Sequence, residues 1–149
     1  MTAIQPVVDG DLDELVSMMS AYCAFYETSP PPEQLAALAR ALLADPDNEG
    51  VQLLARDRSG AAVGFATMYW SWDTTEAIRI AIMHDLFVDP SARGGGVGRA
   101  LIEGCAVEAR RRGLGRLVWS TAPDNATAQR VYDATAAERS TWVEYSLAL

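Results

Sequence analysis

The segment Phe87-Val-Asp-Pro-Ser-Ala-Arg-Gly-Gly-Gly-Val-Gly-Arg99 is the most informative part of the chain. It continues a nearly unbroken apolar run, 77–88, which predicts a central strand covered on both faces. An amphipathic helix is expected to begin directly after the glycines, at Val97. Glycines at such a junction let backbone N–H groups approach a bulky anion, and the positive end of the helix dipole favours phosphate. The segment therefore predicts a phosphate-binding loop, to which Arg93 and Arg99 add positive charge.

Two common nucleotide-binding loops do not match this segment. A dinucleotide loop needs Gly-x-Gly-x-x-Gly, but Arg99 and Leu101 stand where its third glycine would be required. A mononucleotide loop ends in Gly-Lys-Ser/Thr, and the sequence contains no lysine. On these residues alone, a glycine-rich turn that only joins two elements remains an alternative.

The pattern on both sides of the loop predicts one mixed α/β domain over residues 1–149. Apolar residues spaced three and four apart predict a helix that opens at Asp11 and a second one after Pro30–Pro32. Strands are expected at 4–8, 51–56, 62–72, 77–88 and 116–121, and a last helix should begin at Asn125. The alternation over 141–147 predicts a closing strand.

Composition narrows the functional classes. The chain has 149 residues and a formal net charge of −8, which disfavours nucleic acid as a partner and favours cationic small molecules. Cys23 and Cys105 are isolated, so they are expected to be reduced core residues of a cytoplasmic protein, and no metal site is expected. No apolar run is long enough for a membrane span, and no secretory signal is visible.

The run Arg93-Gly-Gly-Gly-Val-Gly98 matches an Arg/Gln-x-x-Gly-x-Gly/Ala signature, and here the chain resembles the GNAT superfamily of acyl-CoA-dependent N-acyltransferases. The segment 84–88 is similar to the family's splayed strand, and 119–125 with Ala128 and Tyr132 is similar to its strand–Asn–helix–Tyr segment. The chain departs from the family at Ala136-Ala137, where a glycine often follows the tyrosine helix. The resemblance implies an α/β GNAT fold, with a mixed central sheet of about six to seven strands flanked by four helices.

The resemblance also implies acetyl-CoA as co-substrate. In the family, main-chain groups of the splayed strand pair with the pantetheine arm and the amides of the loop hold the pyrophosphate. The cofactor-binding residues expected from it are Leu86, Phe87, Val88, Arg93, Gly94, Gly95, Gly96, Val97, Gly98, Arg99, Asn125, Ala128 and Tyr132.

Catalysis of amine acetylation needs a base for the protonated amine and a donor for the departing thiolate. By the resemblance, Tyr132 serves the thiolate, and the backbone N–H near Leu86 stabilises the oxyanion. His84 and Asp85 are the candidate bases, with Glu27 or water as alternatives. Adjacent strand residues face opposite ways, so only one of His84 and Asp85 should face the amine unless the strand bulges there.

The acceptor is expected to be a small molecule with a primary amine that attacks the thioester directly in a ternary complex. Aromatic residues suit a cationic amine, and in related folds two regions rich in them wall the acceptor pocket. The expected substrate-binding residues are Tyr26, Glu27, Trp70, Trp72, His84 and Asp85, whereas Tyr22, Phe25 and Tyr69 are expected to pack in the core. A protein or peptide acetyltransferase and a non-catalytic acetyl-CoA-binding module are the alternatives. Family members are often dimers, so a homodimer is a candidate assembly.

Overall fold

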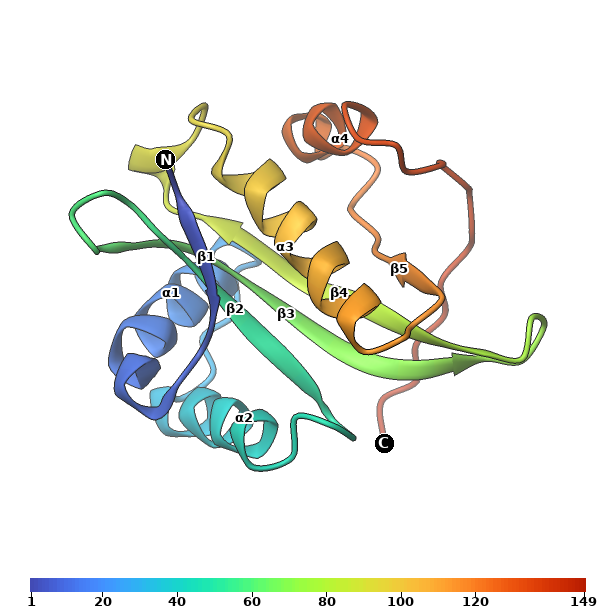
Figure 1. Cartoon of the computed structure of the whole chain (residues 1–149), viewed down its shortest axis with the longest axis horizontal. Coiled ribbons are helices and arrows are strands. Elements are labelled where there is room, and N and C mark those ends of the chain that lie inside the picture. The colour runs from blue at the N-terminus through green and yellow to red at the C-terminus, as the bar shows by residue number, and fades with distance from the viewer.

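The computed structural model describes residues 1–149 and contains one five-stranded sheet in the order β1-β2-β3-β4-β5 (Figure 1). Its strands are β1 (Ala3–Pro6), β2 (Gly50–Arg56), β3 (Ala62–Asp73), β4 (Ile78–Val88) and β5 (Arg116–Val118). The first four strands pair antiparallel, and β5 pairs parallel with β4. The sheet is therefore mixed, and its one parallel pair, which is joined by a helical crossover, lies in the second half of the chain.

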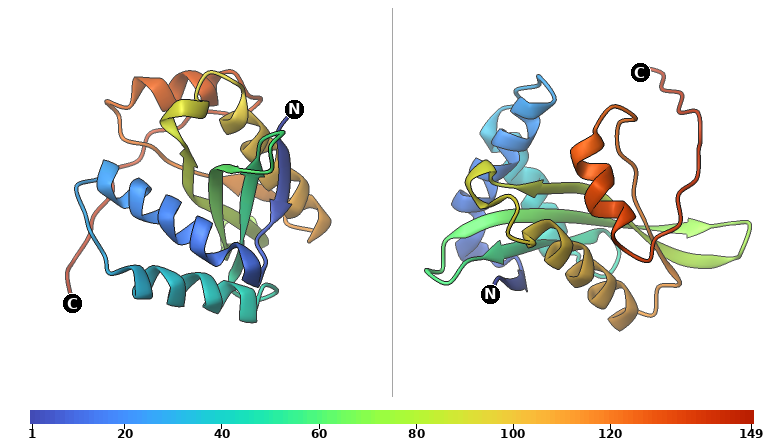
Figure 2. Two further views of the ribbon diagram at one scale, coloured as in Figure 1. Left: turned by 90° about the vertical axis from the view of Figure 1, so that its left-hand side faces the viewer. Right: turned by 90° about the horizontal axis from the view of Figure 1, so that it is seen from above.

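Helices cover both faces of this sheet (Figure 2). Helices α1 (Leu12–Phe25) and α2 (Pro32–Ala44) lie on one face, α3 (Val97–Arg111) lies on the other, and α4 (Ala126–Asp133) follows β5. Proline suits the first turn of α2 because its missing N–H would have no helical partner there. The predicted α/β fold with four helices is confirmed. No helix is both long enough and apolar enough to cross a bilayer.

Two buried clusters, one on each face, hold the layers together. Leu101 and Cys105 of α3 pack on Met68 and neighbouring small residues of the sheet, whereas Leu15 of α1 packs on Phe65. The side chains of β3 alternate between these clusters, as expected of a strand buried on both faces. Replacing the fully buried Phe65 with alanine would cost about 3–5 kcal/mol of stability by the usual cavity penalty.

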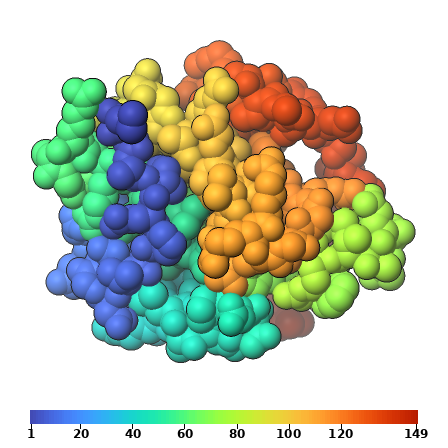
Figure 3. Space-filling model, in the orientation of Figure 1, coloured from blue at the N-terminus to red at the C-terminus, as the bar shows by residue number.

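The closing strand predicted at 141–147 is wrong, and the sheet has five strands instead of about six to seven. Residues 134–149 form neither helix nor strand, and Trp142 and Tyr145 are 89% and 90% exposed. Figure 3 shows this segment standing away from the body of the molecule. The alternation indicates which side chains could share a face, but the neighbouring strand β5 has only three residues and offers few backbone groups for pairing.

Candidate active site

Strand β4 carries one extra residue at His84. Thr67 of β3 lies opposite Asp85 and Met68 lies opposite Met83, so His84 has no partner on β3. A bulge of this kind breaks the alternation of side chains and re-aims them locally. His84 Nδ1 lies 3.2 Å from Asp85 Oδ1, so the structure brings the two candidate bases together.

Asp85 is surrounded by aromatic side chains on the α1 side of the sheet. Tyr22 lies near its carboxylate, the rings of Tyr22 and Tyr26 are 5.1 Å apart, and the Tyr69 ring lies 5.6 Å from the His84 ring. The side chain of Asp85 is only 14% exposed. We call Tyr22, Tyr26, Tyr69, His84 and Asp85 the Asp85 cluster.

Two tyrosine hydroxyls of this cluster stay protonated over a wide pH range. Burial, and then the charge of Asp85, raises the pKa of Tyr69 to about 12. Burial also raises the pKa of Tyr22, helped by the charge of the Asp85 carboxylate and a hydrogen bond to it. Both hydroxyls are therefore neutral near pH 7.

Six successive backbone N–H groups, those of residues 94–99, donate to no acceptor within the chain. The first hydrogen bond of α3 runs from the Ala100 N–H to the Gly96 carbonyl. Gly94 and Gly96 both have φ of 80°, a left-handed conformation that favours glycine. Arg93 Nε donates to the Val88 carbonyl at 3.1 Å, which ties the loop to the end of β4. The free amides and the helix dipole make this loop suited to a phosphate group.

Strands β4 and β5 separate just before the bulge. The last pair between them is Ile82 with Val118, whereas β4 continues to Val88. Residues 83–88 therefore have no strand partner on the β5 side. Backbone groups of β4 are available there to pair with a ligand, between the glycine loop and the Asp85 cluster.

Helix α4 carries Tyr132, whose neighbours are Trp119 and, from the end of α1, Tyr26. The Asn125 side chain accepts a hydrogen bond from the Ala128 N–H at 3.1 Å and so caps the helix. The Tyr132 ring lies 5.6 Å from the Trp119 ring. Burial, and secondarily the charge of Tyr26, raises the pKa of Tyr132, so its hydroxyl is a donor near neutral pH.

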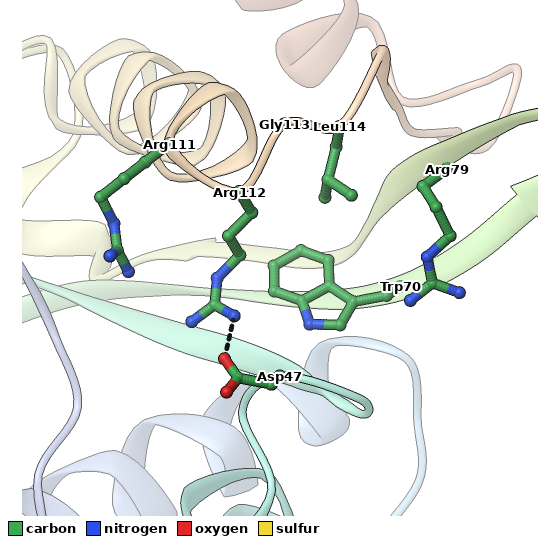
Figure 4. Close-up of a pocket in the computed structure, with 7 residues that line it drawn as sticks. All are labelled: Asp47, Trp70, Arg79, Arg111, Arg112, Gly113 and Leu114. Atoms are coloured by element: carbon green, nitrogen blue, oxygen red, sulfur yellow. Dashed lines mark hydrogen bonds and ion pairs between the residues drawn. The ribbon is translucent and has the colours of Figure 1, made fainter.

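Trp70 and Trp72 are not placed with the other expected substrate-binding residues. Trp70 packs on the α3 side of the sheet, its indole N–H donates to the Pro46 carbonyl at 2.8 Å, and the Arg112 guanidinium lies over its ring. Arg79 lies over the exposed Trp72 ring. Figure 4 shows the cavity of about 440 Å³ beside Trp70, whose lining contains none of the expected catalytic or cofactor-binding residues. It is lined by Asp47, Trp70, Arg79, Arg111, Arg112, Gly113 and Leu114.

Glu27 lies just beyond the end of α1. Its φ of 57° is left-handed, in a position where glycine is the usual residue. The expectation that Phe25 packs in the core is wrong: its side chain is exposed, with its ring 5.1 Å from the Tyr26 ring. The end of α1 thus presents Tyr26 together with an acidic neighbour.

Sequence reasoning assigned Tyr22 and Tyr69 to core packing alone. Tyr22 does pack on the cluster around Phe65, but the structure also places both tyrosines beside Asp85. The spacing of Tyr22 and Tyr26 puts them one helical turn apart, and a buried tyrosine hydroxyl usually needs a polar partner. That spacing was the sequence signal that could have placed Tyr22 in the site. No sequence signal identified Tyr69, because its contact with His84 depends on the bulge.

A sequence model described as the acetyltransferase (GNAT) family matches residues 15–136. The chain belongs to this family. The match extends from α1 through α4 and contains the glycine loop, the bulged strand and Tyr132, so the assignment predicted from these motifs is confirmed. GNAT proteins are acetyltransferases, and this chain is an enzyme of that kind.

Individual relatives agree with the GNAT assignment. An uncharacterized N-acetyltransferase, YhfO, of Bacillus subtilis is 28% identical over 97% of this chain and 95% of its own length. The L-2,4-diaminobutyric acid acetyltransferase of Streptomyces coelicolor is 31% identical over 66% of this chain and 56% of its own. A crystal structure of a probable acetyltransferase superimposes with a TM-score of 0.86 at 27% identity, covering 99% of this chain and 97% of the other.

Proposed function

We propose that this GNAT enzyme transfers an acetyl group from acetyl-CoA to a primary amine of a small molecule, by direct attack within a ternary complex. One observation carries the proposal: the bulge in β4 turns His84 and Asp85 together, beside the strand edge that β5 leaves free. A base, a ligand-pairing strand and a donor hydroxyl on Tyr132 then adjoin one opening.

Acetyl-CoA fits the glycine loop because six free amides and two exposed arginines suit a diphosphate. The coenzyme supplies an activated thioester. The residues proposed to hold its diphosphate are Arg93, Gly94, Gly95, Gly96, Val97, Gly98 and Arg99. Those proposed for its pantetheine arm and thioester end are Leu86, Phe87, Val88, Asn125, Ala128 and Tyr132.

Proton transfers follow from the same geometry. An alkylamine with a pKa of about 10.4 enters as an ammonium ion and must lose a proton before it attacks. Asp85, paired with His84, is placed to accept that proton directly or through water. The Tyr132 hydroxyl donates to the departing thiolate, and the Leu86 N–H stabilises the oxyanion.

Two further points support a small acceptor and define its setting. The Asp85 carboxylate is largely buried, which suits a slender amine better than a folded protein surface. The diaminobutyric acid acetyltransferase acts on a small amine by its name. Tyr26 and Glu27 at the end of α1 would contact the acceptor.

A cytoplasmic location rests on the free thiols of Cys23 and Cys105, and a homodimer stays a prediction.

The test is release of CoA from acetyl-CoA across a panel of amines, with Tyr132→Phe as the variant. We expect turnover with at least one small amine and a fall in kcat of about 10²-fold in the variant. Tyr145→Phe, at an exposed tyrosine outside the site, is the matched control and should match wild type.

Calorimetry with acetyl-CoA gives the second readout. Binding without any CoA release would identify a non-catalytic binding module instead. Turnover of peptides in preference to every free amine would indicate a protein acetyltransferase.

A further inference from the structure

We propose that the acceptor is a diamine or similar cationic amine without a carboxylate, and that its ammonium group binds at the Asp85 cluster. This inference rests on the proposed function and adds the acceptor class. It distinguishes diamines and amino sugars from α-amino acids, which carry a carboxylate beside the amine.

The Asp85 carboxylate carries a charge that no arginine of the chain compensates. Among the ion pairs of the chain, Asp85 takes part only in the contact with His84, a side chain that is 67% exposed and charged only when protonated. No arginine pairs with Asp85; the ion-paired arginines contact other carboxylates, as Arg56 does with Asp11 and Arg116 with Asp73. A largely buried carboxylate is costly unless it is paired, so an ammonium ion from outside the chain would be bound favourably.

The walls of the site also favour a cation. Tyr22, Tyr26 and Tyr69 bring three aromatic rings to the neighbourhood of Asp85, and ring faces attract ammonium groups. Tyr22 and Tyr26 belong to the last turn of α1 and its end, where the helix dipole is negative. Glu27 adds another carboxylate there.

Neither the arginine of β4 nor the arginine that opens the glycine loop is free to hold a substrate carboxylate at the Asp85 cluster. Arg79, the arginine on β4, lies six residues before Asp85, about 20 Å along the strand, and it lies over Trp72. Arg93 donates to the Val88 carbonyl within the glycine loop. A carboxylate beside the amine would therefore meet the field of Asp85 and the negative end of α1 without a compensating arginine.

A pair of acceptors tests this directly: 1,3-diaminopropane and L-2,4-diaminobutyrate have the same spacing between amines and differ by one carboxylate. We expect kcat/KM, measured by CoA release, to be at least about 10-fold higher for the diamine. In Asp85→Asn this ratio should fall toward one, and Asp85→Glu should restore part of it. Asp13→Asn removes an exposed carboxylate from the opposite end of α1 and should keep the wild-type ratio.

Binding without turnover gives an independent readout. Tetramethylammonium, which cannot be acetylated, should inhibit wild type competitively against the diamine and lose that inhibition in Asp85→Asn. Equal or faster turnover of diaminobutyrate by wild type would overturn the inference while leaving the proposed function intact. Failure of every amine to release CoA would instead refute the proposed function, and the inference with it.

Discussion

Two clusters of aromatic and charged residues lie on opposite faces of the β3/β4 pair, and they differ in where their cation comes from. On the α3 side, the Arg112 guanidinium lies over the Trp70 ring (Figure 4). The Arg79 guanidinium lies over the Trp72 ring. On the α1 side, the tyrosines of the Asp85 cluster surround a carboxylate that no arginine contacts. The first cluster is complete within the chain, whereas the second lacks a positive charge.

The contacts of Arg112 show what the first cluster does. Its guanidinium reaches Glu108 at 2.7 Å, Asp47 at 2.9 Å and the Pro46 carbonyl at 2.9 Å. These bonds join the end of α3 to the segment after α2, with Trp70 beneath them. On the α3 side, the aromatic and charged residues thus stabilise the fold. On the α1 side, they leave the charge of Asp85 available for a ligand.

The largest expected effect separates the two clusters by activity. Asp85→Asn should lower kcat/KM by about 10²- to 10⁴-fold, because it removes the candidate base and the charge that binds the ammonium ion. Asp47→Asn, in the other cluster, should change it by less than about 3-fold, because Arg112 keeps its bond to Glu108. The measurement is the initial rate of CoA release. Comparable losses in both variants would mean that the clusters do not differ as described.

The effect of substitutions on the free energy of unfolding should be larger in the cluster around Trp70 than in the Asp85 cluster, the reverse of their effect on activity. Trp70→Ala removes a half-buried ring and the indole bond to Pro46, so the free energy of unfolding should fall by about 2–3 kcal/mol. Asp85→Asn should leave it nearly unchanged or raise it, since it removes a buried charge that the chain does not fully pair. Urea denaturation followed by fluorescence measures both. A larger loss for Asp85→Asn than for Trp70→Ala would show that Asp85 is mainly structural.

A smaller effect concerns alkaline pH. The pKa of Tyr69 is raised to about 12, above the value of about 10 for an unfolded chain, so folding favours its neutral form. This contribution is complete below pH 10 and declines between pH 10 and 12, where the unfolded chain loses the proton first.

Thermal unfolding of wild type and Tyr69→Phe from pH 8 to 12 measures that contribution. The variant should show a shallower decline in Tm than wild type above pH 10. Tyr145→Phe is the control, because its ring is exposed and should leave the slope unaltered. Parallel curves for Tyr69→Phe and wild type would show that the Tyr69 hydroxyl is not buried beside Asp85.

What could be predicted from sequence was local. The position of the glycine loop between a strand and a helix, the helices and the run of β4 were predicted correctly, because spacing along the chain determines them. The bulge at His84 could not be predicted from the sequence, because it depends on how Thr67 and Met68 pair across the sheet. Alternation placed Trp70 and Trp72 on one face, but it could not say that Asp85 would lie on the other. The closing strand failed for a related reason: pairing with β5 is a non-local property.

The unpaired residue in β4 also bears on how this protein can change over evolutionary time. Before position 84 the strand is registered against β5, and after it the strand leads into the glycine loop. Substituting His84 alters a single side chain, whereas deleting it would remove the bulge: Met83 and Asp85 would become neighbours opposite Met68 and Thr67, and both halves of the strand would keep the faces that they have now. The two cores therefore tolerate the gain or loss of this one residue, and what depends on it is the contact between the His84 and Asp85 side chains.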